Sequence, residues 1–355
     1  MRPAQAVINL AALKHNYLLA KQLTQAKALA VVKADAYGHG SIRCAQALHE
    51  ADGFAVAFLE EALVLRAAGV TQPILLLEGF FVKDELALIA EYDLWTAVHS
   101  AWQLEAINQA QLSRPIQCWL KMDSGMHRMG FAPEEYKKAW QALNASPNVS
   151  NIVLMTHLSQ ADEVEQPRTK EQLITFNAAR AGLNSAVSMR NSPGILAWPE
   201  LPSDWVRPGI MLYGCSPFEE PQAPANALIP VMTLASQIIG VRELAAGEPV
   251  GYGARYITPS STRVGIVAMG YADGYPRQVD SGTPVAVCGQ LTKIIGRVSM
   301  DMLAVDITTI AEATLGSPVE LWGKQVSAEV IARAANTISY QLFCNLKRVP
   351  RYYLE

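Results

Sequence analysis

The sequence has little charge and no excess of either sign. Only 17% of its 355 residues are charged, against roughly 25% in an average soluble protein, and 29 basic against 32 acidic residues leave a net charge of −3. This balance provides no basic face for nucleic acid or for an acidic membrane surface. Because 50% of the residues are hydrophobic, an intrinsically disordered chain is excluded as well.

Cysteine is scarce, and long hydrophobic runs are missing. The five cysteines are scattered with no Cys-x-x-Cys pair, which excludes a disulfide framework and fits the reducing cytoplasm, where we expect the protein to work. The longest uncharged stretch, residues 221–241, contains three prolines and is no membrane helix. The N-terminus shows no convincing export signal.

The first two thirds of the chain alternate short apolar runs with amphipathic segments. The runs are continuously apolar, as expected of parallel strands covered on both faces. The predicted strands are Ala28–Lys33, Phe54–Phe58, Pro73–Glu78, Trp95–His99, Ile116–Asp123, Ile152–Leu158, Ala186–Ser192 and Trp205–Gly214. Helical patterns between them include Leu59–Ala68, Asp84–Ala90, Ala101–Ala110, Pro133–Leu143 and Thr169–Leu183. This predicts an α/β fold, a (β/α)₈ barrel. A doubly wound sheet is disfavoured because a glycine-rich first turn is absent.

Composition changes after Gly214. A segment rich in proline and alanine, Pro217–Pro230, resembles a linker, and the short runs beyond it are rich in Val, Ile and Thr and separated by Gly and Pro. They predict a mainly β domain with one late helix over Ser327–Asn336. We therefore expect a barrel domain at residues 1–228 and a β-rich domain at 229–355, with about the first nine residues packing on the latter.

The carboxyl ends of barrel strands form the rim that carries active sites, so polar residues there are functional candidates. The candidates are Lys33, Glu78, His99, Lys121, Asp123, His157, Asn191, Ser192, Arg207 and Tyr213. Lys33 is the most informative. Desolvation at the end of a buried strand favours a free amine, as a Schiff-base lysine requires. The alternative for Lys33 alone is a lysine that extends its ammonium to solvent. Residues 37–40, Tyr-Gly-His-Gly, predict a flexible polar turn.

The string around this lysine, VVKADAYGHG at residues 31–40, resembles the pyridoxal 5′-phosphate (PLP) lysine signature of alanine racemases. The resemblance runs along nearly the whole chain in the same order. Its further motifs are KMDSGMHRMGF (121–131), MTHLSQAD (155–162), MRNSPG (189–194), VRPGIMLYG (206–214), VGYGARY (250–256), MGYADGYPR (269–277), GRVSMDM (296–302) and ISYQLFCNLKRVPR (338–351).

Racemisation removes an α-proton and returns one from the opposite face, which requires two bases. The resemblance implies that Lys33 carries PLP and serves one face, and that Tyr252 serves the other from the second subunit of a homodimer. A phenol needs cationic neighbours to act near neutral pH, and His157 and Arg207 are candidates. In the family the histidine pairs with the tyrosine, and the arginine faces the pyridine nitrogen of PLP.

The resemblance also assigns the other groups around cofactor and substrate. Asn191 precedes a short helix whose N-terminus would face an anion. The implied phosphate donors are Tyr37, Ser192, the backbone of Gly209 and Ile210, and Tyr340. Lys121 is implied to be carbamylated and to orient Arg128 toward cofactor and substrate. Tyr271, Met300 and Asp301 would line the entrance and the substrate carboxylate site, where Tyr271 and Tyr340 favour a small side chain.

No metal site is expected, because the histidines lack ligand spacing. The expected activity is the interconversion of L-alanine and D-alanine. The alternatives are a PLP decarboxylase on the same two-domain plan, although those run longer and carry a cysteine-led string where this chain has GRVSMD, and a non-catalytic PLP-binding barrel, which lacks a β-rich domain. An enzyme that supplies D-alanine for peptidoglycan and one that consumes alanine would share these motifs.

Overall fold

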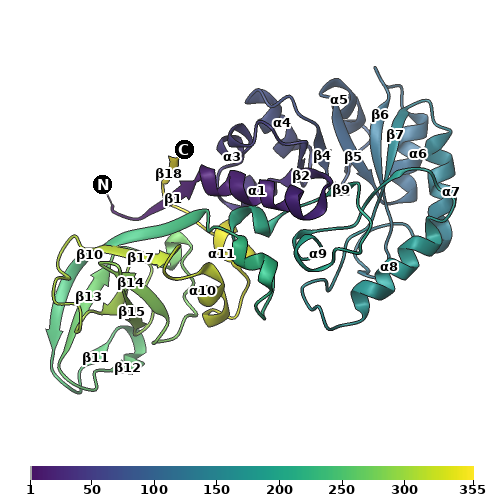
Figure 1. Cartoon of the computed structure of the whole chain (residues 1–355). Coiled ribbons are helices and arrows are strands. Elements are labelled where there is room, and N and C mark those ends of the chain that lie inside the picture. The colour runs from purple at the N-terminus through teal and green to yellow at the C-terminus, as the bar shows by residue number, and fades with distance from the viewer. Residues whose placement is uncertain (1) are drawn as a thin grey trace.

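The computed structural model describes residues 2–355, which form two parts, each built around its own eight-stranded sheet. Figure 1 shows a parallel barrel wrapped by helices on one side and a β-rich domain on the other. The barrel sheet has eight strands in the order β8-β7-β6-β5-β4-β3-β2-β9, all parallel. This confirms the predicted α/β barrel with a mainly β domain after it.

The barrel strands are short and almost wholly buried, which explains why their sequences are apolar without alternation. They are β2 (Lys27–Val31), β3 (Gly53–Val56), β4 (Ile74–Leu76), β5 (Leu94–Val98), β6 (Ile116–Lys121), β7 (Val149–Met155), β8 (Ala186–Ser188) and β9 (Trp205–Val206). β8 and β9 are joined by single hydrogen bonds rather than by a ladder. One of these runs from the Asp204 N–H to the Val187 carbonyl (2.8 Å).

The helices of the barrel domain alternate with the strands along the chain and cover the outside of the sheet. They are α1 (Leu10–Thr24), α2 (Lys33–Tyr37), α3 (Ser41–Ala47), α4 (Leu59–Ala67), α5 (Glu85–Glu91), α6 (Ala101–Gln109), α7 (Pro133–Asn144), α8 (Arg168–Ala179), α9 (Ser192–Ala197) and the 3₁₀ turns η1 (Ile210–Tyr213) and η2 (Ala223–Ala227). Asn9 caps α1 by accepting the Ala12 N–H, and Pro133 opens α7, as expected of a first-turn proline.

Two sequence predictions in this domain were wrong. The run Trp205–Gly214 is a strand only over its first two residues, because Pro208 and Gly209 end the pairing and the chain continues as η1. The predicted strand Ala186–Ser192 ends at Ser188, and Ser192 instead begins α9, where the Asn191 side chain accepts the Gly194 N–H. In both segments, predicted site residues therefore lie on turns and at helix starts rather than on strands.

A long antiparallel strand organises the β-rich domain. β10 (Met232–Leu244) pairs with both β13 and β17, which closes a ring of strands. It also pairs with β1, and β1 in turn connects β18 to the sheet. The strands are β1 (Gln5–Asn9), β11 (Pro249–Val250), β12 (Tyr256–Ile257), β13 (Thr262–Val267), β14 (Pro284–Val287), β15 (Gln290–Ile295), β16 (Leu303–Asp306), β17 (Pro318–Trp322) and β18 (Arg351–Leu354). The 3₁₀ turns are η3 (Tyr252–Ala254) and η4 (Tyr271–Asp273).

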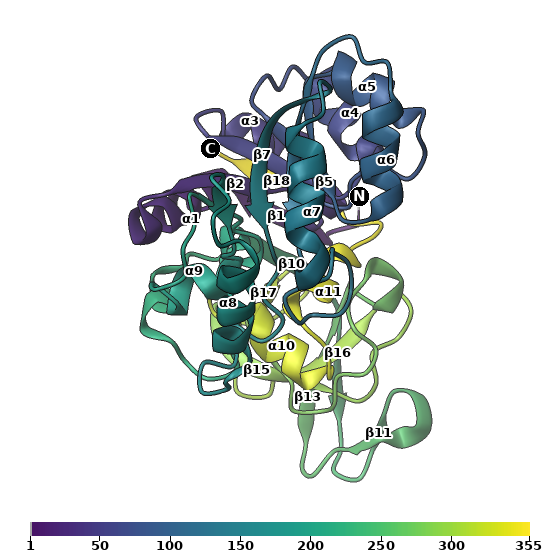
Figure 2. The same ribbon diagram turned by 90° about the vertical axis from the view of Figure 1, so that its right-hand side faces the viewer.

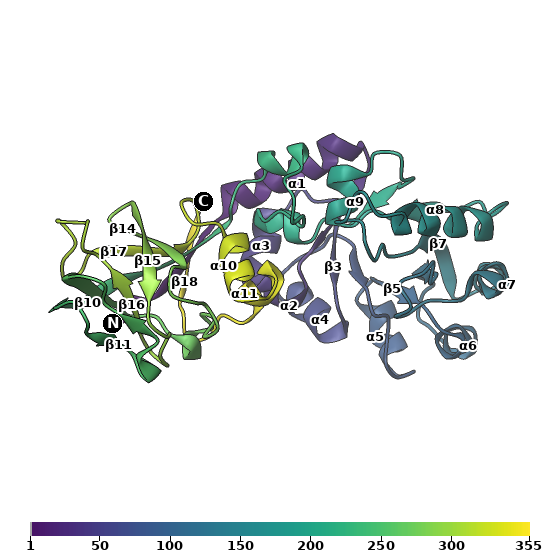
Figure 3. The ribbon, with the colours of Figure 1, turned by 90° about the horizontal axis from the view of Figure 1, so that it is seen from below.

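The two domains share elements. β1 precedes the barrel in the chain but lies between β10 and β18 in the second sheet. The helices α10 (Ala328–Ala334) and α11 (Ser339–Cys344) lie between the β-rich sheet and the barrel (Figure 3), and the Ser327 side chain caps α10. No helix within residues 2–355 is both long and apolar enough to span a bilayer.

Candidate functional site

One cavity of about 540 Å³ opens at the carboxyl ends of the barrel strands. It collects every residue that the sequence proposed for cofactor binding, together with Lys121 at the end of β6 and Arg128 from the loop that follows. The predicted residues that line it are Lys33, Tyr37, Lys121, Arg128, His157, Asn191, Ser192, Arg207, Gly209, Ile210 and Tyr340. Parallel strands bring their carboxyl ends to one rim, so residues far apart in sequence meet there.

Lys33 begins an unusual turn at the end of β2. Ala34, Asp35, Ala36 and Tyr37 all have φ between +48° and +55°, so the segment is one turn of left-handed helix without a glycine. Such a conformation costs roughly 1–2 kcal/mol per residue. The predicted flexible polar turn over residues 37–40 is therefore wrong: the segment is buried, and the His39 ring packs against Tyr213 and Phe343.

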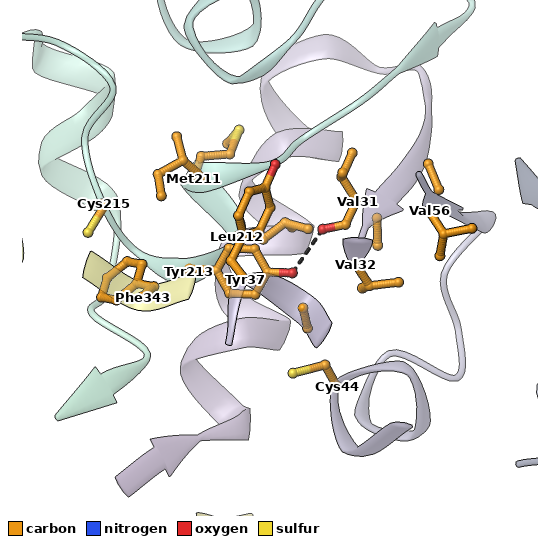
Figure 4. Packing of buried hydrophobic residues seen from close by; sticks show 14 of the residues in the cluster. Val31, Val32, Tyr37, Cys44, Val56, Met211, Leu212, Tyr213, Cys215 and Phe343 are labelled. Atoms are coloured by element: carbon orange, nitrogen blue, oxygen red, sulfur yellow. Dashed lines mark hydrogen bonds between the residues drawn. The ribbon is translucent and has the colours of Figure 1, made fainter. Parts of the chain in front are cut away.

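The strand end before Lys33 is fixed from inside the barrel. Tyr213 donates a hydrogen bond to the Val31 carbonyl (2.8 Å), and its ring packs edge-on against Tyr37 with centroids 4.8 Å apart (Figure 4). Tyr37 in turn makes an edge contact with Tyr340 at 5.7 Å. Burial raises the pKa of both Tyr37 and Tyr340, so their phenols stay protonated near neutral pH and can donate.

Small donors converge on one side of the cavity. The Gly209 N–H donates to Ser192 Oγ (2.9 Å), and the Met211 N–H reaches the same oxygen at 3.3 Å. A Cβ placed on Gly209 would lie 2.9 Å from the Tyr37 hydroxyl, so glycine keeps this space open. Tyr37, Ser192 and Gly209 line the same cavity, and hydroxyls and backbone N–H groups around one concave space suit a phosphate.

Arg207 lies across the cavity and is only 4% exposed. Its guanidinium donates to carbonyl oxygens of Ser188 (3.0 Å) and Thr156 (2.8 Å), so backbone dipoles satisfy its charge. Burial lowers the pKa of Arg207 to about 10, which leaves it protonated at neutral pH. The hydrogen bonds to the two carbonyl oxygens hold this buried guanidinium in a fixed orientation.

Lys121 is the desolvated lysine of this cavity. It is 8% exposed, and burial together with the positive charges of Arg128, Arg207 and Lys33 lowers its pKa to about 8. His157 lies among the same cations. Burial and then Arg207 and Lys121 hold the pKa of His157 well below its usual value, so the imidazole is neutral near pH 7. Of the two cation sources suggested for Tyr252, only Arg207 carries charge in this environment.

Of the predicted site residues in the β-rich domain, Tyr340 lines the cavity and four others do not. Within residues 2–355, Tyr252, Tyr271, Met300 and Asp301 are absent from its lining, and the side chain of Tyr252 is 70% exposed. Tyr252 begins η3 in the β11–β12 hairpin, which projects from the end of the domain farthest from the barrel in Figure 2.

A network of charges holds the Tyr271 and Asp301 turns together. Asp273 is fully buried at the end of η4, accepts the Gly270 N–H (2.9 Å) and pairs with Arg2 and Arg348. Burial alone would raise the pKa of Asp273, but the hydrogen bonds from Arg2 and from the Gly270 backbone outweigh it and lower that pKa. Arg348 also pairs with Asp301 (2.7 Å), so both turns are anchored to one carboxylate and one arginine.

Comparisons with known proteins match both halves of the chain. The family model described as "Alanine racemase, N-terminal domain" matches residues 8–217, and the model described as "Alanine racemase, C-terminal domain" matches residues 231–353. The chain belongs to the alanine racemase family. The predicted family membership is therefore confirmed.

Individual alanine racemases are similar over their whole length. The chain is 64% identical to "Alanine racemase, catabolic" from Pseudomonas putida, over 100% of this chain and 99% of the relative. It is 61% identical to a protein of the same name from Pseudomonas aeruginosa, over 99% of each. The solved structure of a biosynthetic alanine racemase from Pseudomonas aeruginosa matches with a TM-score of 0.96 at 46% identity and covers 100% of both chains.

Two further residues line this alanine racemase cavity. Glu78 follows β4, as its place among the strand-end candidates predicted, although the sequence suggested no role for it. Cys344 also lines the cavity, one helical turn after Tyr340 on α11, and this i, i+4 spacing was the available signal. No group of three or more potential metal ligands gathers anywhere from Arg2 to Glu355.

Proposed function

We propose that this protein is a PLP-dependent enzyme that interconverts L-alanine and D-alanine, with Lys33 and Tyr252 as bases on opposite faces of the substrate. The observation that carries the proposal is the cavity at the barrel rim. There a lysine at a strand end, a cluster of phosphate-type donors and a buried arginine face one space. The membership of the alanine racemase family agrees with each of these features.

The residues present fit this cofactor. Lys33 would hold it covalently, and Tyr37, Ser192, Tyr340 and the backbone N–H groups of Gly209 and Ile210 would hold its phosphate. The fit rests on the space that Gly209 leaves beside the Tyr37 hydroxyl, which a Cβ would fill. Asn191 supports this side of the cavity through its cap of α9.

Arg207 would face the pyridine nitrogen. When bound, the cofactor supplies a conjugated ring that accepts the electron pair left on the α-carbon after proton removal. Arg207 gives up its proton reluctantly, so it would leave that nitrogen unprotonated and the cofactor would be a weaker electron sink. We expect this arrangement to limit side reactions such as transamination, which need a stronger sink.

The two bases come from different chains in this proposal. Lys33 lies in the cavity, while Tyr252 is exposed and distant from it in its own chain. A homodimer in which the β-rich domain of one subunit covers the barrel of the other would bring Tyr252 to the second face. The same docking would bring Tyr271, Met300 and Asp301 to the entrance, where they narrow it to a small side chain.

Lys121 would be carbamylated and would orient Arg128 toward the cofactor and the substrate carboxylate. A lysine with a pKa of about 8 has a substantial fraction of free amine near neutral pH, and the free amine is the form that adds carbon dioxide. The product is an anion among Arg128, Arg207 and Lys33, so it relieves the repulsion between them.

We also propose a catabolic role and a cytoplasmic location. The chain is 61% identical to the Pseudomonas aeruginosa relative named catabolic and 46% identical to the biosynthetic enzyme of that organism whose structure is solved. Deletion of the gene should then impair growth on alanine as a carbon source. Strict dependence on added D-alanine after this single deletion would support wall synthesis instead.

The activity is tested by incubating the purified protein with L-alanine and measuring D-alanine. Carbon dioxide release in place of D-alanine would support a decarboxylase, and bound cofactor without turnover would support a non-catalytic carrier. Lys33→Ala should lose the covalently held cofactor, and Tyr252→Phe should keep it while losing activity. Full activity in Tyr252→Phe would overturn the two-base assignment.

A further inference from the structure

Glu61 makes two hydrogen bonds that connect separate parts of the barrel rim. It lies in the first turn of α4, and its Oε2 accepts the Ala57 N–H (2.8 Å) just before the helix begins. Its Oε1 accepts the Ala34 N–H (2.6 Å), which belongs to the peptide bond that follows Lys33. One carboxylate therefore spans the end of β3 and the residue that carries the proposed cofactor.

The first of these bonds has an ordinary explanation. A glutamate in the first turn commonly reaches back to a backbone N–H at the start of its own helix, which stabilises the helix end. The bond to Ala34 has no such explanation, because Ala34 is 27 residues away in the sequence. It is charge-assisted, and such bonds are shorter and stronger than those between neutral groups.

The turn that Glu61 contacts needs external support. Four successive left-handed residues after Lys33 persist only where surrounding contacts determine their conformation. On the far side of the turn, the Asp35 carboxylate accepts the Ser41 N–H (2.7 Å) and pairs with Arg351 of β18 (2.6 Å). The His39 ring bonds the carbonyls of Ala36 and Tyr37 from beneath. At the Lys33 end, the supporting side chain is Glu61.

We propose that Glu61 is a positioning residue that sets the peptide after Lys33, and with it the direction in which the Lys33 amine and the Tyr37 hydroxyl enter the cavity. This inference rests on the proposed function, because it gives Lys33 and Tyr37 the task of holding PLP. Glu61 is absent from the described residues that line the cavity, so it acts through the turn rather than on the substrate.

Glu61→Gln breaks the link between Ala57 and Ala34 while keeping the size of the side chain. A glutamine side chain has one acceptor oxygen and one amide group that can only donate, so it cannot serve the N–H groups of both Ala57 and Ala34. The neighbouring Glu60 is exposed on the same first turn, and Glu60→Gln makes the same chemical change as a matched control. Glu61→Ala removes both bonds.

The experiment compares the purified holoenzymes in three measurements: the rate of cofactor loss on dialysis, followed by the absorbance of the Lys33-bound group; kcat and KM for L-alanine; and the melting temperature. Glu61→Gln should lose cofactor about tenfold faster and show kcat about tenfold lower, with KM within about twofold, as the removal of one charged hydrogen bond predicts. Glu61→Ala should exceed these changes, and Glu60→Gln should match the wild type.

Lower melting temperatures in Glu61→Gln and Glu61→Ala, with unchanged cofactor loss and unchanged kcat in both, would overturn the inference, because helix capping would then be the only role of Glu61. A failure of the proposed function has a different signature. In that case Lys33→Ala would retain the cofactor as firmly as the wild type, whatever the behaviour of Glu61→Gln.

Discussion

The barrel and the β-rich domain present their predicted site residues in opposite states. Those of the barrel converge on one cavity and are mostly buried, while Tyr252, Tyr271, Met300 and Asp301 are exposed on the other domain. A barrel rim gathers its residues within one chain because parallel strands end at one edge. The β-rich domain sends Tyr340 of α11 into this cavity but leaves these four residues outside it.

The largest effect should come from mixing two inactive variants. Lys33→Ala and Tyr252→Phe should each lower D-alanine formation by at least about 10³-fold, since each removes a base. If the barrel and the β-rich domain of different chains complete one site, subunit exchange creates one intact site in each mixed dimer. Activity should then return to about a quarter of the wild-type value at equal concentrations.

The control for this experiment is native mass spectrometry of the mixture, which shows whether dimers of mixed composition form. Exchange without recovered activity in the first mixture would mean that Tyr252 and Lys33 act within the same chain.

The buried cation of the barrel should matter more for stability than an exposed one in the β-rich domain. Arg207→Gln removes the donor to the Thr156 carbonyl and one of the two donors to the Ser188 carbonyl, at a cost of about 2–4 kcal/mol in the free energy of unfolding. Arg348→Gln should cost less, because its side chain is half-exposed and Arg2 still pairs with Asp273. Urea unfolding measures both, and the reverse order would contradict this comparison.

Lys121 predicts a pH dependence of stability in buffer free of carbon dioxide. Its folded pKa of about 8 lies below its usual value of 10.5, so between these values the unfolded chain binds more protons than the folded one. Stability therefore rises with pH across this window, by about 1–3 kcal/mol. The rise should disappear in Lys121→Met and persist in Lys293→Met, a change at an exposed lysine of β15. A rise that survives Lys121→Met belongs to another group.

The smallest effect should distinguish two glycines. Gly209→Ala places a Cβ 2.9 Å from the Tyr37 hydroxyl and should weaken cofactor affinity about tenfold with little loss of fold stability. In the β-rich domain, Gly240→Ala places its Cβ 3.8 Å from Ile266, an ordinary contact, and should leave cofactor affinity unchanged. If a fluorescence titration gave the two variants equal affinities for the cofactor, Gly209 would not shape the phosphate site.

Much of the barrel and its cavity follows from local sequence. Buried parallel strands require continuous apolar runs, so most of the strands could be predicted within a few residues, and their carboxyl ends marked Lys33, Lys121 and His157. The residues after Lys33 could not be predicted this way. Nothing in Ala34–Tyr37 favours left-handed backbone, and only contacts from Glu61, Arg351 and the packed His39 ring stabilise it.

The sequence by itself determined the apolar strands, the helix caps at Asn9 and Ser327, and the ordered motifs of the alanine racemase family, because these depend on neighbouring residues and on hydrophobic burial. The tertiary structure decided which charges are neighbours. Lys121 acquires its pKa of about 8 from burial and from Arg128, Arg207 and Lys33, and Asp273 its low pKa from Arg2 and Arg348 at opposite ends of the chain. Electrostatic interactions depend on distance in space, and folding alone sets that distance.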